Sequence, residues 1–216
     1  MSHTDRDVLR RLAGEVAEAA AEPIQQERID GWKRVNALAD HRPMLWITEI
    51  PWGEFEDLVE ELRCVCADEP CRRIERGLRR RLFTARRLTT DEVVHGRFYV
   101  PKAITGLNFG IDISERQLDQ GATHIRSHYY DSVLADFDDL EKIRQGPVEH
   151  DEAETARRAE RAEGLFGDLL PVEVHGLRKT FFNGWDQVVR WTGPTQAPMA
   201  LAARPRSLRA HMTRTR

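Results

Sequence analysis

The sequence predicts an α/β fold with a parallel sheet, because segments with helical periodicity alternate with short apolar runs. Its 216 residues are enough for one or two domains. Hydrophobic residues make up 40% and charged residues 32%, which excludes collagen-like and low-complexity proteins and argues against wholesale disorder. The sequence contains no internal repeat and no flexible Gly/Ser linker.

The first half of the chain predicts four helices and one strand. Apolar residues recur every three or four positions over 5–21 and over about 23–39, and Pro23 suits a first helical turn. Met44 to Ile47 predicts a short buried strand that ends in the polar and aromatic loop 48–53. Two helices follow over 54–62 and 68–87, the second with Asp68 as its N-cap.

The second half predicts further strands and helices in alternation. Residues 93–100 have extended composition and end at Pro101, and 107–113 is a weaker strand candidate. A short acidic helix is predicted over 136–143 and an amphipathic one over 150–166. The apolar run 169–174 predicts the next strand, which ends at His175, and 195–203 predicts another helix.

The distribution of charge and apolar residues indicates where the protein resides. No apolar run approaches the roughly 20 residues of a membrane span, and the N-terminus lacks the apolar stretch of a secretory signal. Three cysteines are too few for a disulfide framework. We therefore expect a cytoplasmic protein without a membrane partner. The net charge is −3, but the residues after Asp186 include six arginines and no acid.

The cysteines have the spacing Cys64-x-Cys66-x4-Cys71. Thiolate zinc sites usually combine a C-x2-4-C pair with a second pair further along the chain, and this sequence has no second pair. We interpret the three as structural cysteines, with Cys71 buried in a helix. A metal site is the alternative.

Two polar clusters have both a structural and a functional interpretation. Arginines crowd the segment from Arg72 to Arg87, where they predict a solvated, ion-paired helix face rather than a nucleic-acid site. His124 and His128 have a His-x3-His spacing that suits metal binding on a helix, but the strand-like composition around them favours ordinary packing.

Glu49 and His175 stand out by position, because each follows an apolar segment predicted to be a strand. Ligands of α/β proteins bind at the carboxyl ends of strands. We therefore predict that both residues contact substrate, with Trp52, Asn183 and Asp186 in the loops beyond. Loop capping and packing is the alternative. The sequence has no P-loop, GxGxxG, HExxH or Ser-His-Asp order.

The order of the segments over roughly residues 5–203 resembles the N-terminal part of the uroporphyrinogen decarboxylase superfamily. The most similar branch is a bacterial one related to corrinoid-dependent methyltransferases. After a two-helix opening, the resemblance rests on RPMLWITEIPW, CADEPCRRIERGLRRRLF, VVHGRFYVPKAI, SHYYD, DLEKI, GDLLPVEVHG and FFNGWDQVVRW.

The resemblance implies a (β/α)8 TIM barrel, which typically needs about 250 residues. It predicts that this chain is the first half of such a barrel. Residues 1–40 would form an N-terminal helical segment and 41–203 the incomplete barrel. The tail 204–216 is basic with poor apolar periodicity, so we expect a frameshift near residue 204, with a genuine basic tail as the alternative.

The resemblance also implies the chemistry of the parent enzyme. Methyltransferases of this superfamily bind zinc through a His-x-Cys pair and a later Cys, and nothing in this chain matches those ligands. We expect no cofactor in this chain, whereas zinc and a corrinoid would belong to the full-length parent. The Arg-Phe-Pro-type opening of the decarboxylases is also absent, and Arg42-Pro43 is a poor substitute. No catalytic residue is transferred by motif.

Three functional hypotheses follow. The first is a fragment of a barrel methyltransferase that acts on a small-molecule substrate and a corrinoid protein or thiol; alone it would be inactive, and unstable or prone to self-association through open strand edges. The second is a stand-alone α/β binding module whose basic surface holds an acidic partner, nucleic acid being the less favoured one. The third is uroporphyrinogen decarboxylation itself.

Overall fold

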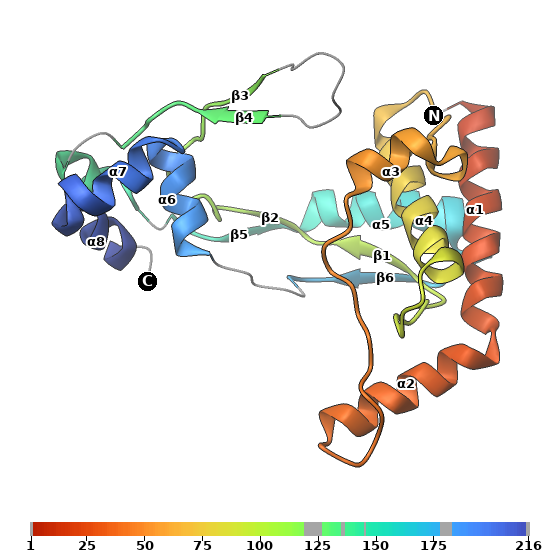
Figure 1. Cartoon of the computed structure of the whole chain (residues 1–216). Coiled ribbons are helices and arrows are strands. Elements are labelled where there is room, and N and C mark those ends of the chain that lie inside the picture. Colours follow the sequence, from red (N-terminus) through yellow and green to blue (C-terminus); the bar gives the residue numbers. More distant parts are fainter. Residues whose placement is uncertain (1, 119–126, 135–136, 145, 178–182, 215–216) are drawn as a thin grey trace. The chain divides into compact units, whose positions relative to one another are not determined.

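The computed structural model describes residues 2–118, 127–134, 137–144, 146–177 and 183–214 of the chain (Figure 1). It is a mixed α/β fold, as the sequence predicts. The chain divides into two compact units, one of residues 1–101 with 155–175 and the other of residues 102–154 with 176–216. No described helix is long and apolar enough to cross a bilayer.

The first unit begins with the two predicted helices, α1 (His3–Ala21) and α2 (Pro23–Asn36). Ser2 caps α1 by accepting a hydrogen bond from the Asp5 backbone N–H at 3.0 Å, and Pro23 occupies the first turn of α2. α3 (Trp52–Leu58), the 3-10 turn η1 (Glu60–Leu62) and α4 (Glu69–Arg87) follow. The Asp68 carboxylate caps α4, which confirms its predicted role.

A parallel pair of strands completes this unit. β1 (Phe98–Pro101) lies beside β6 (Val172–His175), with Tyr99 opposite Glu173 and Pro101 opposite His175. The chain reaches β6 through α5 (Glu152–Phe166), most of which belongs to this unit. A single apolar core joins α1, α4, α5 and β1, and its members include Leu9, Val16, Leu78, Leu82, Val100, Leu165 and Phe166.

The second unit contains two antiparallel strand pairs and four short helical segments among its described residues. β2 (Ala103–Thr105) pairs with β5 (Glu149–Asp151), and β3 (Glu115–Leu118) pairs with β4 (Ser127–Tyr130). The helical segments are η2 (Phe137–Lys142), α6 (Gly184–Thr192), α7 (Gln196–Ala203) and α8 (Pro205–Arg214). Trp191 is fully buried in one small core, and Val188, Ala197 and Leu208 form another.

Two predicted strands are wrong. Residues 39–51 form no strand: Leu45, in the middle of the apolar run, exchanges hydrogen bonds with Asp91, which belongs to no strand. Residues 107–113 form a turn, because Phe109 and Gly110 adopt positive φ angles of 54° and 72° that no strand accommodates.

The tail contains a helix that the sequence analysis does not predict. Residues 205–214 form α8. One apolar anchor is sufficient here, because Leu208 is buried against Val188 and Ala197 while Arg206 and Arg209 stay exposed. Alanine, leucine, methionine and arginine also favour helix intrinsically.

Candidate functional site

His175 ends strand β6, as predicted, and belongs to a row of three rings on the first unit. Because strand side chains alternate, Phe98 and Val100 pack into the core while Tyr99 lies on the other face of β1. The Tyr99 ring meets the His175 ring edge to face, with centroids 5.5 Å apart. The His95 and Tyr99 rings also meet edge to face, with centroids 6.4 Å apart. These three residues form what we call the His–Tyr–His row.

An ion pair joins the two strands beside this row. Arg97 Nη1 lies 2.5 Å from Glu173 Oε2, and Glu173 is the register partner of Tyr99. The hydrogen bond to Glu173 raises the pKa of Arg97. The pair joins the residue before β1 to the first half of β6, two residues before His175.

A hollow of about 570 Å³ adjoins His95. Its volume falls within the range of small-molecule sites. Two tryptophans, Trp32 and Trp46, line it, together with Lys33 and Asn36 from α2 and with Glu92. We call it the tryptophan hollow, and its lining residues are Ile29, Trp32, Lys33, Asn36, Trp46, Glu92, Val93 and His95.

Asp91 fixes the wall that carries Trp46. Its carboxylate accepts two hydrogen bonds from Arg42, at 2.9 and 2.5 Å, and one from the Leu45 backbone N–H at 2.8 Å. Its own N–H donates to the Leu45 carbonyl at 2.8 Å. The Arg42 guanidinium and the Leu45 N–H hold the pKa of Asp91 far below its usual range, so the anchor is charged at neutral pH.

Helix α2 supplies the wall that carries Trp32. Trp32 Nε1 donates to the Asp91 carbonyl at 2.8 Å, which fixes the orientation of its ring. Buried Gln25 bridges two backbones, because it accepts from the Val94 N–H at 2.9 Å and donates to the Ala19 carbonyl at 3.1 Å. Both walls are therefore held by buried or charge-assisted hydrogen bonds.

The hollow is suited to a flat, conjugated ligand with polar edges. Tryptophan faces stack on planar rings and attract electron-poor groups. Lys33, Asn36 and His95 supply hydrogen-bond donors at the margin, and Glu92 supplies an acceptor. Trp46 is half exposed, so its face is accessible from solvent.

Glu49 does not occupy its predicted position. It lies in the irregular segment 39–51 and is exposed, with no strand before it. The structure therefore does not place Glu49 and His175 at the ends of neighbouring strands. The residues named with them have local roles: Asn183 caps α6 by accepting from the Trp185 and Asp186 N–H groups, and Trp52 lies under the Arg80 guanidinium, 5.0 Å away.

The three cysteines surround a tightly tied loop before α4. Cys66 and Cys71 are buried, as predicted for Cys71, and Cys64 is half-buried. Burial raises the pKa of Cys66 to about 12 and that of Cys71 to about 11, so both stay protonated at neutral pH. In the part of the chain that the structure describes, no group of three or more His, Cys, Asp or Glu side chains is placed to hold a metal ion.

The structure tests the interpretation of the arginine-rich segment 72–87 but not that of His124 and His128. On α4, Arg79 pairs with Glu75 at 2.8 Å and Arg80 with Glu56 at 2.6 Å, so the ion-paired interpretation of the basic helix is confirmed for these arginines. The His-x3-His spacing cannot be followed, because His124 and the side chain of His128 lie outside the described residues.

Sequence reasoning missed the tryptophan hollow. Trp32, Trp46 and His95 come from three separate segments, and Trp32 was assigned to an ordinary amphipathic face. The one feature of the sequence that could have indicated this site is Trp46, in the apolar run 44–47 that follows the polar residues 40–43. No known protein family, curated protein or solved structure matches the chain.

Proposed function

We propose that this chain supplies a substrate-binding part of an α/β enzyme similar to the uroporphyrinogen decarboxylase and corrinoid methyltransferase superfamily. In this proposal the ligand is a flat macrocycle, and the reaction moves a methyl group between a corrinoid and a thiol. The observation that carries the proposal is the tryptophan hollow, which adjoins His95 of the His–Tyr–His row in the segment before strand β1.

In this proposal, different residues contact the faces and the polar edge of the ligand. Trp32 and Trp46 contact the faces of the ring, while Lys33 and His95 contact its polar edge. His175 acts through Tyr99: the edge-to-face contact of their rings fixes Tyr99, and Tyr99 in turn orients His95. His175 is thus a positioning residue, which refines the sequence prediction that it touches substrate.

Calorimetric titration with two macrocycles tests the proposal. Methylcobalamin represents the corrinoid and coproporphyrin the tetrapyrrole of the decarboxylase branch. We expect methylcobalamin to bind, and Trp46→Ala to weaken binding about tenfold or more, because base–aromatic stacking of comparable area is worth about 1–3 kcal/mol. Leu58→Ala is the matched control, since Leu58 is an exposed apolar residue outside the hollow.

Each outcome has a definite meaning. Binding of coproporphyrin in preference to methylcobalamin replaces methyl transfer by the decarboxylase reaction. Equal losses in Trp46→Ala and Leu58→Ala, or no heat with either macrocycle, contradict the proposed site.

A binding module is the second candidate, and α8 is the observation that favours it. Arg206 and Arg209 are exposed on this helix, and no acid follows Asp186 in the chain. A surface of this kind can hold an acidic partner. The test is binding of heparin at increasing salt, where real charge neutralisation gives an affinity that falls steeply with salt and a flat profile eliminates this candidate.

A further inference from the structure

A second cavity of the first unit lies among α4, β1 and α5. Its volume is about 320 Å³. Its lining is largely apolar and includes the ring pair of Phe98 and Phe166, whose centroids are 4.4 Å apart. The other residues of this part of the lining are Ile74, Tyr99, Val100, Pro101, Ala162 and Leu165. Phe98 and Ile74 are only partly buried, so part of this apolar surface faces the cavity.

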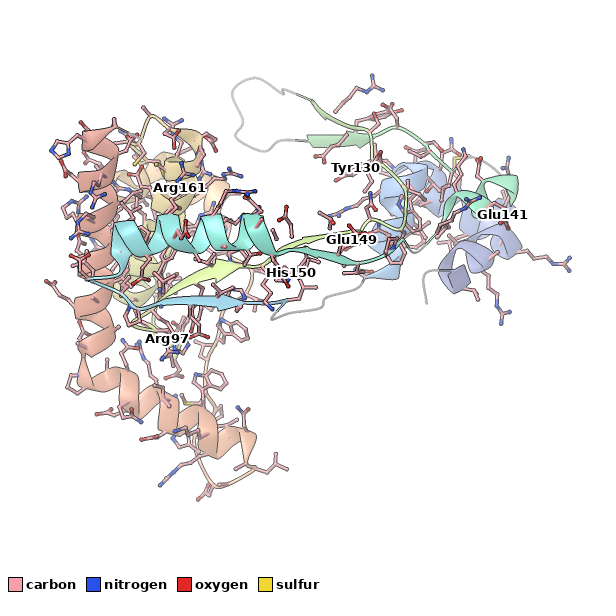
Figure 2. The ribbon with its side chains drawn as sticks, turned by 180° about the vertical axis from the view of Figure 1, so that it is seen from behind. Arg97, Tyr130, Glu141, Glu149, His150 and Arg161 are labelled. Carbon is pink, nitrogen blue, oxygen red and sulfur yellow. The ribbon has the colours of Figure 1, made fainter. Side chains whose placement is uncertain are left out.

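Three arginines line the same cavity. Arg73 comes from α4, and Arg158 and Arg161 come from α5. Figure 2 shows the labelled Arg161 on α5. Among the described residues, the lining includes no Asp or Glu. The cavity therefore combines a largely apolar lining with guanidinium groups from two helices.

We propose that this cavity, the arginine cavity, binds an apolar molecule that carries one carboxylate, namely an aliphatic or aromatic monocarboxylic acid. The apolar tail would lie on Phe98 and Phe166, where its burial is favourable. Arg161 and Arg73 would bind the carboxylate, because a guanidinium fork matches a carboxylate in bidentate geometry. The volume lies at the lower end of ligand pockets, so the molecule is small.

This inference does not depend on the proposed function. The arginine cavity shares no lining residue with the tryptophan hollow, and Tyr99 is the one residue that belongs both to its lining and to the His–Tyr–His row. The proposed ligands also differ, because the hollow would take a flat ring and the cavity a small apolar tail with a charge. Trp46 lines only the hollow and Arg161 lines only the cavity, so variants at these two residues distinguish failure of one proposal from failure of the other.

Calorimetric titration of the whole chain with three probes tests the proposal. Octanoate carries both the tail and the charge, octanol only the tail, and inorganic phosphate only charge. We expect octanoate to bind at least tenfold more tightly than either of the others. Arg161→Gln should weaken octanoate binding about tenfold, as expected for one charge-assisted hydrogen bond.

Arg157→Gln is the matched control, because Arg157 is an exposed arginine of the same helix that does not line the cavity. It should leave octanoate binding unchanged. Equal affinity for octanol and octanoate, equal loss in both variants, or no octanoate binding would each overturn the proposal. Sedimentation velocity tests whether a second copy of the chain occupies the cavity instead. If the wild-type chain is a dimer, Arg161→Gln dissociates it, and octanoate does not bind, the cavity is a dimer contact and the proposal is overturned.

Discussion

Glu75 offers the sharpest test of what holds the first unit together. Its side chain is completely buried on α4. The carboxylate accepts hydrogen bonds from the Val65 N–H at 2.9 Å, the Cys66 N–H at 2.8 Å and Arg79 Nε at 2.8 Å. The perturbation is Glu75→Gln, which preserves the volume of the side chain and removes its charge.

The structure sets the size of the expected loss. In the variant, the amide NH2 group has to face backbone N–H donors, and Arg79, which is 12% exposed, loses its counter-charge. Removing one partner of a buried ion pair destabilises by about 3–5 kcal/mol. A typical domain has a free energy of unfolding of about 5–15 kcal/mol, so the variant should lose a large share of it.

Urea unfolding followed by circular dichroism at pH 7 measures this difference. Glu61→Ala is the control, because Glu61 of η1 pairs with Arg87 at the exposed end of α4, and loss of this surface ion pair should change stability little. A loss below about 1 kcal/mol in Glu75→Gln, or an equal loss in both variants, would refute the reasoning.

The difference in free energy of unfolding between the wild type and Glu75→Gln should also depend on pH. Burial raises the pKa of Glu75, but the hydrogen bonds from Cys66, Val65 and Arg79 outweigh burial and lower it. A depressed folded pKa adds stability above the unfolded value of about 4.3, and that stability is lost as the pH falls through the folded pKa. The difference between the wild type and Glu75→Gln should therefore shrink below about pH 4. A difference that stays constant down to pH 2 would contradict this assignment.

Three further predictions follow from the described contacts. Asp91→Asn should free the wall around Leu45, and hydrogen exchange should rise at the Leu45 amide first; unchanged exchange there would contradict the anchor. Iodoacetamide at pH 8 should leave Cys66 and Cys71 unmodified in the folded chain and label both in urea, as mass spectrometry can show; rapid labelling of either when folded would contradict their burial. Trp191→Phe should cost less than the roughly 3–5 kcal/mol of a full truncation, because buried Trp191 Nε1 has no hydrogen-bond partner among the described residues; urea unfolding measures it, and a larger loss would reveal a partner.

Local signals explain why the helices could be predicted. Apolar residues at helical spacing bury one face of α1, and the Asp68 carboxylate caps α4 within its own segment. These features act over a few residues, so they are readable in the sequence. The position of His175 at the end of a strand was also predictable, because it follows the apolar run 169–174 and precedes Gly176.

Long-range contacts explain what could not be predicted. The run from Met44 to Ile47 has the composition of a buried strand, but no described strand pairs with it, and Trp46 is half exposed. The parallel register of Phe98 with Val172 joins distant segments, and nothing in either segment specifies it. The tryptophan hollow has the same origin, since Asp91 holds Leu45 and Trp32 together across the chain.

The site itself is tested most directly by the tryptophan indole signals of the chain in a proton–nitrogen correlation spectrum during titration with methylcobalamin. The chain has five tryptophans, of which Trp32 and Trp46 line the hollow, while Trp185 and Trp191 belong to the other unit and serve as internal controls. We predict that the signals of Trp32 and Trp46 shift in a saturable manner and that those of Trp185 and Trp191 stay in place. Unmoved signals of Trp32 and Trp46 at saturating methylcobalamin, or equal shifts of all indoles, would contradict the proposed ligand site.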